Sequence, residues 1–208
     1  MKTKFYYFYL LLVSLFCWPA NAAASDYQDA MRTALAGLDA AESNYLPCRN
    51  QFERVAQMYP DEWLPVYYTA YCDLQMIYVK QAAVNTQSLL DEAKSLLEKL
   101  MATPGADPSE VSTLWGYYYM AIITLDAANG QKYFQQAIGA YEKAIGLNPD
   151  NPRPVCLLAF FKQFLPAFMR VDKEIAEGKE KAIALFEKET PSTEKPHWGA
   201  FYLNMIQQ

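Results

Sequence analysis

The chain has 208 residues and a formal net charge of −5, from 18 basic and 23 acidic side chains. This acidic balance, without a basic cluster, repels nucleic acid and anionic lipid and so excludes both classes of partner. The single histidine, His197, cannot form a metal cluster and has no companion for a nucleophilic dyad. We therefore expect no enzyme activity, no metal and no cofactor, and we expect His197 to cap or pack beside Trp198.

The first 22 residues have the pattern of a secretory leader. Two lysines precede an apolar stretch from Phe5 to Trp18, and residues 20–22 provide an Ala-x-Ala step for cleavage after Ala22. About 14 apolar residues are too few for a membrane-spanning helix, which needs about 20. We expect residues 1–22 to be removed, which leaves residues 23–208 as a single periplasmic or secreted domain that is not inserted in a membrane.

The rest of the chain has the periodicity of amphipathic helices. Apolar residues recur at spacings of three and four, and proline, glycine and asparagine interrupt the pattern where helices should end. Pro166 falls inside one expected helix and should kink or split it, because proline cannot donate a backbone hydrogen bond. No alternating β pattern of useful length is present, so the expected fold is all-α. The expected helices cover residues 25–42, 44–59, 61–80, 86–101, 109–128, 131–147, 152–171, 172–188 and 196–206.

The sequence is internally duplicated. Residues 48–99 align without a gap on residues 137–188 at a constant offset of 89, and weaker matches extend the two units to about 25–114 and 115–207. Repetition on this scale is typical of a stacked solenoid, in which each unit buries its apolar face against a neighbour. Identical residues in register include Pro60 and Pro149, Val66 and Val155, and Ala70 and Ala159.

One segment carries a recognisable repeat pattern. Ala137, Tyr141, Ala144 and Pro149 follow the order small, large, small, proline. This order resembles the second helix and closing proline of a tetratricopeptide repeat (TPR), and residues 52–60 form a weaker copy. The resemblance covers about residues 25–207 and implies a TPR-like solenoid, a right-handed α-α superhelix of four helical hairpins and a C-terminal capping helix. Each hairpin would have about 44 residues, against about 34 in the family.

The resemblance implies a binding groove, because the first helix of each hairpin lines the concave face in this family. Tyrosine combines apolar area with a hydroxyl group, which suits contacts with peptides or sugars. The alternative is that these aromatic residues pack the thin core of the solenoid. The candidate groove residues are Tyr67, Tyr71, Tyr78, Trp115, Tyr118, Phe160 and Phe164.

Three functional hypotheses follow. The first is a scaffold, not an enzyme, that binds a protein or peptide of the cell envelope along the aromatic groove. The second is a module that binds or senses a small ligand, either a glycan or a hydrophobic molecule, held by Tyr67, Tyr71, Trp115 and Tyr118. The third is a structural module that associates with itself as a homodimer. The sequence does not name the partner or the ligand.

The cysteines leave two alternatives open. Cys48 and Cys72 lie at similar distances from the turn at Pro60-Asp61, so an antiparallel hairpin would place them level. If their side chains face each other, the Cα atoms could approach to the roughly 4.4–6.8 Å that a disulfide needs. If they lie on different faces, both are buried thiols. Cys156 corresponds to Tyr67 and has no partner.

Overall fold

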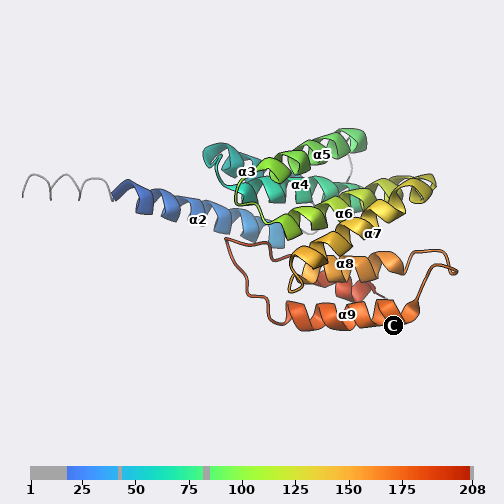
Figure 1. Cartoon of the computed structure of the whole chain (residues 1–208). Helices are drawn as coiled ribbons and strands as arrows, with labels where there is room; N and C mark the ends of the chain where they lie inside the picture. Colours follow the sequence, from blue (N-terminus) through green and yellow to red (C-terminus); the bar gives the residue numbers. More distant parts are fainter. Residues whose placement is uncertain (1–17, 42–43, 82–84, 207–208) are drawn as a thin grey trace, which may run out of the picture.

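The computed structural model of this chain describes residues 18–41, 44–81 and 85–206. Residues 1–17 of the expected leader lie outside this part. The described residues form helices and contain no strand, which confirms the all-α expectation (Figure 1). The elements are α2 (Trp18–Asp39), α3 (Leu46–Met58), α4 (Trp63–Tyr78), α5 (Thr86–Ala102), α6 (Pro108–Leu125), η1 (Ala127–Asn129), α7 (Gly130–Leu147), α8 (Pro152–Lys162), α9 (Asp172–Phe186) and η2 (Ala200–Met205).

Consecutive helices pack in pairs, namely α2 with α3, α4 with α5, α6 with α7 and α8 with α9. The first helices of successive hairpins also touch, because α6 contacts both α4 and α8. Figure 1 shows the hairpins stacked side by side. This is the TPR-like helical-repeat fold that the sequence predicts. We call the surface formed by α4, α6 and α8 the inner face.

The helix boundaries reproduce the duplication. α4 begins at Trp63 and α8 at Pro152, and α3 ends at Met58 and α7 at Leu147, so both boundaries recur at the offset of 89. The expected division between residues 114 and 115 falls inside α6. The second unit therefore begins with a helix that starts at Pro108.

Polar caps explain where several helices begin. The side chain of Asp107 accepts hydrogen bonds from the amides of Ser109 and Glu110 at the start of α6, and Asn151 accepts one from the amide of Arg153 at the start of α8. A proline follows each cap, where the missing amide hydrogen costs little. These caps fix the start of two helices that contribute to the inner face.

Two expected helices differ in the structure. α8 ends at Lys162 and not near residue 171, because Pro166 interrupts the helix as its chemistry predicts. Residues 196–206 do not form a capping α-helix. Gly199 instead has a φ of 104°, in the left-handed region that glycine tolerates, and the chain turns there into the short η2.

The core combines small and aromatic residues. Tyr67, Tyr68, Tyr117 and Tyr141 are fully buried, and the Cβ that an alanine would carry at position 116 would lie 2.5 Å from Cε1 of Tyr141. Close helix packing therefore depends on small residues, as the sequence predicts. The recurring buried alanines are Ala34, Ala70, Ala93, Ala121, Ala137, Ala159 and Ala182.

None of the described helices is long and apolar enough to cross a membrane. The expected cleavage site after Ala22 falls within α2, whose described buried residues begin at Tyr27. Removal of the leader is therefore compatible with the packing of Tyr27, Met31 and Ala34 against the core.

Candidate functional site

The chain covers part of its own inner face. Residues 190–206, which we call the C-terminal segment, run from α9 toward α2 and return beside α8 (Figure 1). The ring of Trp198 lies 4.3 Å from that of Tyr71 and 5.8 Å from that of Tyr117. Its indole Nε1 donates a hydrogen bond to the Tyr67 hydroxyl at 2.8 Å. The segment thus places an indole against the aromatic stripe that the sequence identifies as a groove.

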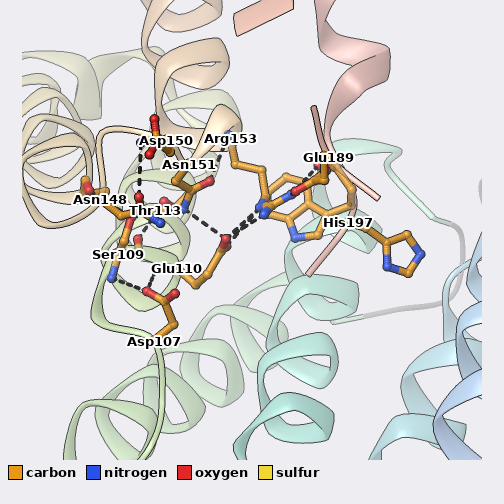
Figure 2. Close-up of polar contacts among 12 residues, drawn as sticks. Asp107, Ser109, Glu110, Thr113, Asn148, Asp150, Asn151, Arg153, Glu189 and His197 are labelled. Carbon is orange, nitrogen blue, oxygen red and sulfur yellow. Dashed lines mark hydrogen bonds and ion pairs between the residues drawn. The ribbon is translucent and has the colours of Figure 1, made fainter. Parts of the chain in front are cut away.

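A buried ion cluster holds this segment in place (Figure 2). Arg153 Nη2 lies 2.8 Å from Oε1 of Glu110, and Arg153 Nη1 lies 2.7 Å from Oε1 of Glu189. Burial alone would lower the pKa of Arg153, but the charge and hydrogen bonds of Glu110 raise it above its ordinary value. Glu110 also accepts hydrogen bonds from the Tyr67 hydroxyl and from the side-chain amide of Asn151. The cluster joins α4, α6 and α8 to the chain that follows α9.

A cleft of about 540 Å³ remains beside Trp198. It lies between the end of α2, the residue before α3, the inner side of α4 and the C-terminal segment. Its volume is within the range of small-molecule sites. Among the described residues that line the cleft, Asp39 is the only Asp, Glu, Lys or Arg. These lining residues are Leu38, Asp39, Tyr45, Tyr68, Tyr71, Gln75, Val79, His197, Trp198, Gly199, Ala200 and Phe201.

The cleft tyrosines stay neutral. Burial raises the pKa of Tyr45, Tyr68 and Tyr71 above the ordinary value for tyrosine. The Tyr68 hydroxyl accepts the backbone N–H of His197 at 3.2 Å, and the Tyr71 hydroxyl accepts the side-chain amide of Gln75 at 2.6 Å. These side chains therefore provide aromatic walls and not anionic ligands.

His197 lines the cleft, and its expected role of capping or packing beside Trp198 stays a prediction. Its Nδ1 is buried and has no hydrogen-bond partner in the described part of the chain. Figure 2 shows the ring directed away from the pair formed by Glu110 and Arg153. A buried polar atom without a partner is uncommon and requires an explanation.

The predicted groove residues on α4 have different environments. Tyr67 is fully buried and bonded to Glu110, and Tyr71 lines the cleft. Tyr78 stacks on Tyr117 with 4.4 Å between ring centroids, and its hydroxyl donates to the Tyr117 carbonyl. Of these three tyrosines, only Tyr71 lines the cleft.

The other predicted groove residues do not line the cleft. Trp115 contacts Tyr118 and Tyr119 on its own helix, and its buried Nε1 has no partner among the described residues. Phe160 packs on Tyr202 of the C-terminal segment, with 5.0 Å between ring centroids. Phe164 is 68% exposed just beyond α8. The structure therefore separates the predicted groove residues into several groups.

Cys48 and Cys72 are buried free thiols in the structure, and so is Cys156. The Cys48 thiol donates to the Gly37 carbonyl at 3.3 Å, which directs it toward α2. Burial raises the pKa of Cys72, and the neighbouring Cys48 raises it further. Whether the pair bridges in an oxidising compartment remains a prediction. Alkylation of the unreduced mature chain tests it, because a bridge would leave one modified cysteine and not three.

Sequence reasoning did not identify Glu110, Arg153 and Glu189, and it did not place Tyr45 and Tyr68 at a site. The sequence contains one indication of this cluster: Arg153 occupies the position that corresponds to the apolar Leu64 in the first unit. A charge at a buried position of an otherwise apolar helix usually has a buried partner. The partners Glu110 and Glu189 are 43 and 36 residues away, so only the fold reveals them.

No protein-family model matches the chain, and no curated protein does. The HusA haemophore from Porphyromonas gingivalis is similar in structure, with a TM-score of 0.76 and 25% identity over 86% of this chain and 90% of that chain. A MamA RS-1 ArsTM double mutant aligns with a TM-score of 0.46 and 19% identity, over 78% of this chain and 76% of that chain. The stacked hairpins and the likeness to the haemophore agree with a TPR-like helical-repeat fold. This likeness extends over most of both chains.

Proposed function

We propose that this chain binds haem, or a closely related porphyrin, in the cleft beside Trp198, and that it acts as an exported binding protein and not as an enzyme. The observation that carries the proposal is the ligand-sized cleft of about 540 Å³ with aromatic walls. Its position in a chain that resembles a haemophore along most of its length supports the ligand class. The leader pattern supports export.

The chemistry of the cleft suits a flat apolar macrocycle. Tyr71, Trp198 and Phe201 offer ring faces or edges, and burial of apolar surface contributes about 25 cal/mol per Å². No lysine or arginine is among the lining residues in the described part of the chain. The two carboxylates of haem would therefore lie toward solvent, because burying an unpaired charge is costly.

The structure favours this hypothesis over peptide binding along the inner face. A peptide on the aromatic stripe would have to displace Trp198 from its hydrogen bond with Tyr67 and its contact with Tyr71. It would also have to release Glu189 from Arg153. A small ligand in the cleft requires neither change.

Titration of the mature chain with ferric haem and with metal-free protoporphyrin IX tests the proposal, with visible absorbance and tryptophan fluorescence as readouts. We expect saturable binding of both compounds at one site. Phe201→Ser should weaken both about tenfold, because it removes an aromatic wall. Phe164→Ser is the matched control, because Phe164 is another exposed phenylalanine but does not line the cleft. Absence of saturable binding would overturn the proposal.

The charge at the rim provides a second test. Asp39 is exposed and should repel the haem carboxylates, so Asp39→Asn should tighten haem binding about two- to fivefold. The dimethyl ester of haem lacks these charges, so its affinity should not change. An equal effect on both ligands would show that the carboxylates do not lie near this rim.

Protein binding is a second candidate, favoured by a separate observation. The loop between α8 and α9 exposes apolar side chains, including Phe168, which is 88% exposed, and Phe164, which is 68% exposed. Exposed apolar clusters often mark interaction sites. A photo-crosslinking residue at position 168 should capture an envelope protein in native cells, and one at exposed Leu147 should not. Equal capture at both positions would count against this candidate.

A further inference from the structure

The backbone around His197 is fixed on both sides. The N–H of His197 donates to the Tyr68 hydroxyl of α4, and Arg153 Nη1 of α8 donates to the carbonyl of Trp198. The indole of Trp198 is held in turn by Tyr67. His197 therefore lines the cleft from an anchored backbone, although it belongs to an irregular segment.

The imidazole ring of His197 makes no hydrogen bond to the described residues. Its Nδ1 is buried without a partner, and neither ring nitrogen makes a hydrogen bond to any described residue. A neutral imidazole has one lone pair that can accept a proton or bind a metal. Because Nδ1 is buried, the nitrogen that could bind iron in the cleft is Nε2, whose lone pair is free when Nδ1 carries the proton.

The other side chains of the cleft are weaker candidates for iron binding. Haem iron in proteins is held by His, Met, Cys thiolate or Tyr phenolate, and no Met or Cys is among the described residues that line the cleft. The hydroxyls of Tyr68 and Tyr71 are engaged by His197 N–H and by Gln75, and burial opposes their ionisation. Tyr45 is the remaining competitor, and burial raises its pKa as well.

The donor set fits iron that arrives within a porphyrin. No group of three His, Cys, Asp or Glu side chains that could hold a bare metal ion exists among the described residues. Iron in haem already has four nitrogen ligands from the macrocycle, so a single side chain completes an axial bond. One imidazole at the edge of an aromatic cleft meets this requirement.

We propose that His197 is the axial ligand of haem iron in this cleft. The inference rests on the proposed function, because it requires haem to occupy the site. It assigns two separate roles to the cleft. The aromatic walls bind the macrocycle whether or not it contains iron, whereas His197 adds affinity and a coordination bond only when iron is present.

The test compares ferric haem with metal-free protoporphyrin IX on the wild-type chain, His197→Ala and Tyr45→Phe. His197→Ala should weaken haem binding at least tenfold and change its affinity for metal-free protoporphyrin less than twofold. The Soret maximum and the electron paramagnetic resonance spectrum of bound haem should also lose the features of imidazole ligation, and free imidazole should restore them. Tyr45→Phe removes the competing oxygen and keeps the ring, so it tests Tyr45 as the alternative ligand. Phe164→Ser, which lies outside the cleft, should leave both spectra unchanged.

The outcomes separate the two proposals. If the wild-type chain binds neither compound, both proposals fail. If it binds both compounds but His197→Ala leaves the haem spectra unchanged, only the ligand assignment is wrong. A loss of the axial signal in Tyr45→Phe, with none in His197→Ala, would assign the bond to Tyr45. Circular dichroism of His197→Ala should match the wild type, because the ring makes no hydrogen bond to the described chain.

Discussion

The two halves of the chain use corresponding helices in different ways. In the first half, α4 borders an open cleft through Tyr68, Tyr71 and Gln75. The C-terminal segment contacts α4 through Trp198, and in the second half it covers α8, where Arg153 and Phe160 contact it directly. The same repeat can therefore supply either a ligand-binding wall or an internal docking surface, depending on a few side chains.

Substitutions between the two copies explain the difference. Arg153 stands where the first unit has Leu64, so α8 has a charge that bonds Glu110 and Glu189. Pro166 stands where α4 has Ile77, so α8 ends earlier. The second copy therefore has a buried arginine that binds two glutamates, and its helix α8 is shorter than α4 by about a turn. The C-terminal segment packs against α8.

The largest expected effect comes from making the two copies alike at this anchor. Arg153→Leu, which copies Leu64, should lower the free energy of unfolding by about 3–5 kcal/mol, because it leaves the buried Glu110 unpaired. Urea denaturation measures this change. Adding Glu110→Gln should recover much of the loss, because no buried charge then remains unpaired. Little recovery would show that Arg153 contributes mainly through packing.

Asp73 and its counterpart Lys162 provide a second contrast. Lys162 pairs with Glu174 on the surface, whereas Asp73 is fully buried, bonded to Arg49 Nε at 3.0 Å, and has one oxygen without a partner in the described chain. Burial raises the pKa of Asp73 to about 7, although Arg49 opposes the rise.

This shift predicts a pH dependence of stability. Between pH 4 and pH 7 the unfolded chain has released the Asp73 proton while the folded chain retains it, so rising pH favours unfolding by up to about 4 kcal/mol. Asp73→Asn should remove this loss and be more stable than the wild type at pH 8. Urea denaturation at pH 5, 6 and 8 measures it, with Glu98→Gln on the exposed face of α5 as the control. The same pH slope in Asp73→Asn would contradict the assignment.

A smaller effect is expected where the hairpins pack differently. Phe52 stacks on Tyr68 with 4.8 Å between ring centroids, whereas its counterpart Tyr141 lies against Gly116. Gly116→Ala should cost about 1–3 kcal/mol, because the new Cβ overlaps the Tyr141 ring. Gly139→Ala, which has nothing within 4 Å of its Cβ, should instead stabilise the exposed helix by about 0.5–1 kcal/mol. Thermal unfolding measures both effects: the melting temperature should fall in Gly116→Ala and rise in Gly139→Ala.

The smallest effect on stability is expected at the apolar loop after α8. Phe168→Ser should change the free energy of unfolding by less than about 0.5 kcal/mol, because the side chain is 88% exposed. A partner that uses this loop would lose affinity while stability remained unchanged. A large loss of stability would instead show that the loop packs against the rest of the chain.

Some site residues could be predicted because their signals are local or repeated. Tyr71 follows from helical periodicity, and the break in α8 follows from Pro166. The expected capping or packing role of His197 stays a prediction, and its unpartnered Nδ1 could not be foreseen. The missing partner depends on which residues pack around the imidazole ring, and the sequence near His197 does not specify these residues.

The helices, their order and the duplicated TPR-like plan can be predicted from local signals, because caps, prolines and apolar spacing act within a few residues of one another. The tertiary structure alone decided that the C-terminal segment folds back, that Trp198 reaches Tyr67 across 131 positions, and that a cleft remains beside it. Such contacts depend on how all the helices pack together. A local pattern in the chain does not encode them.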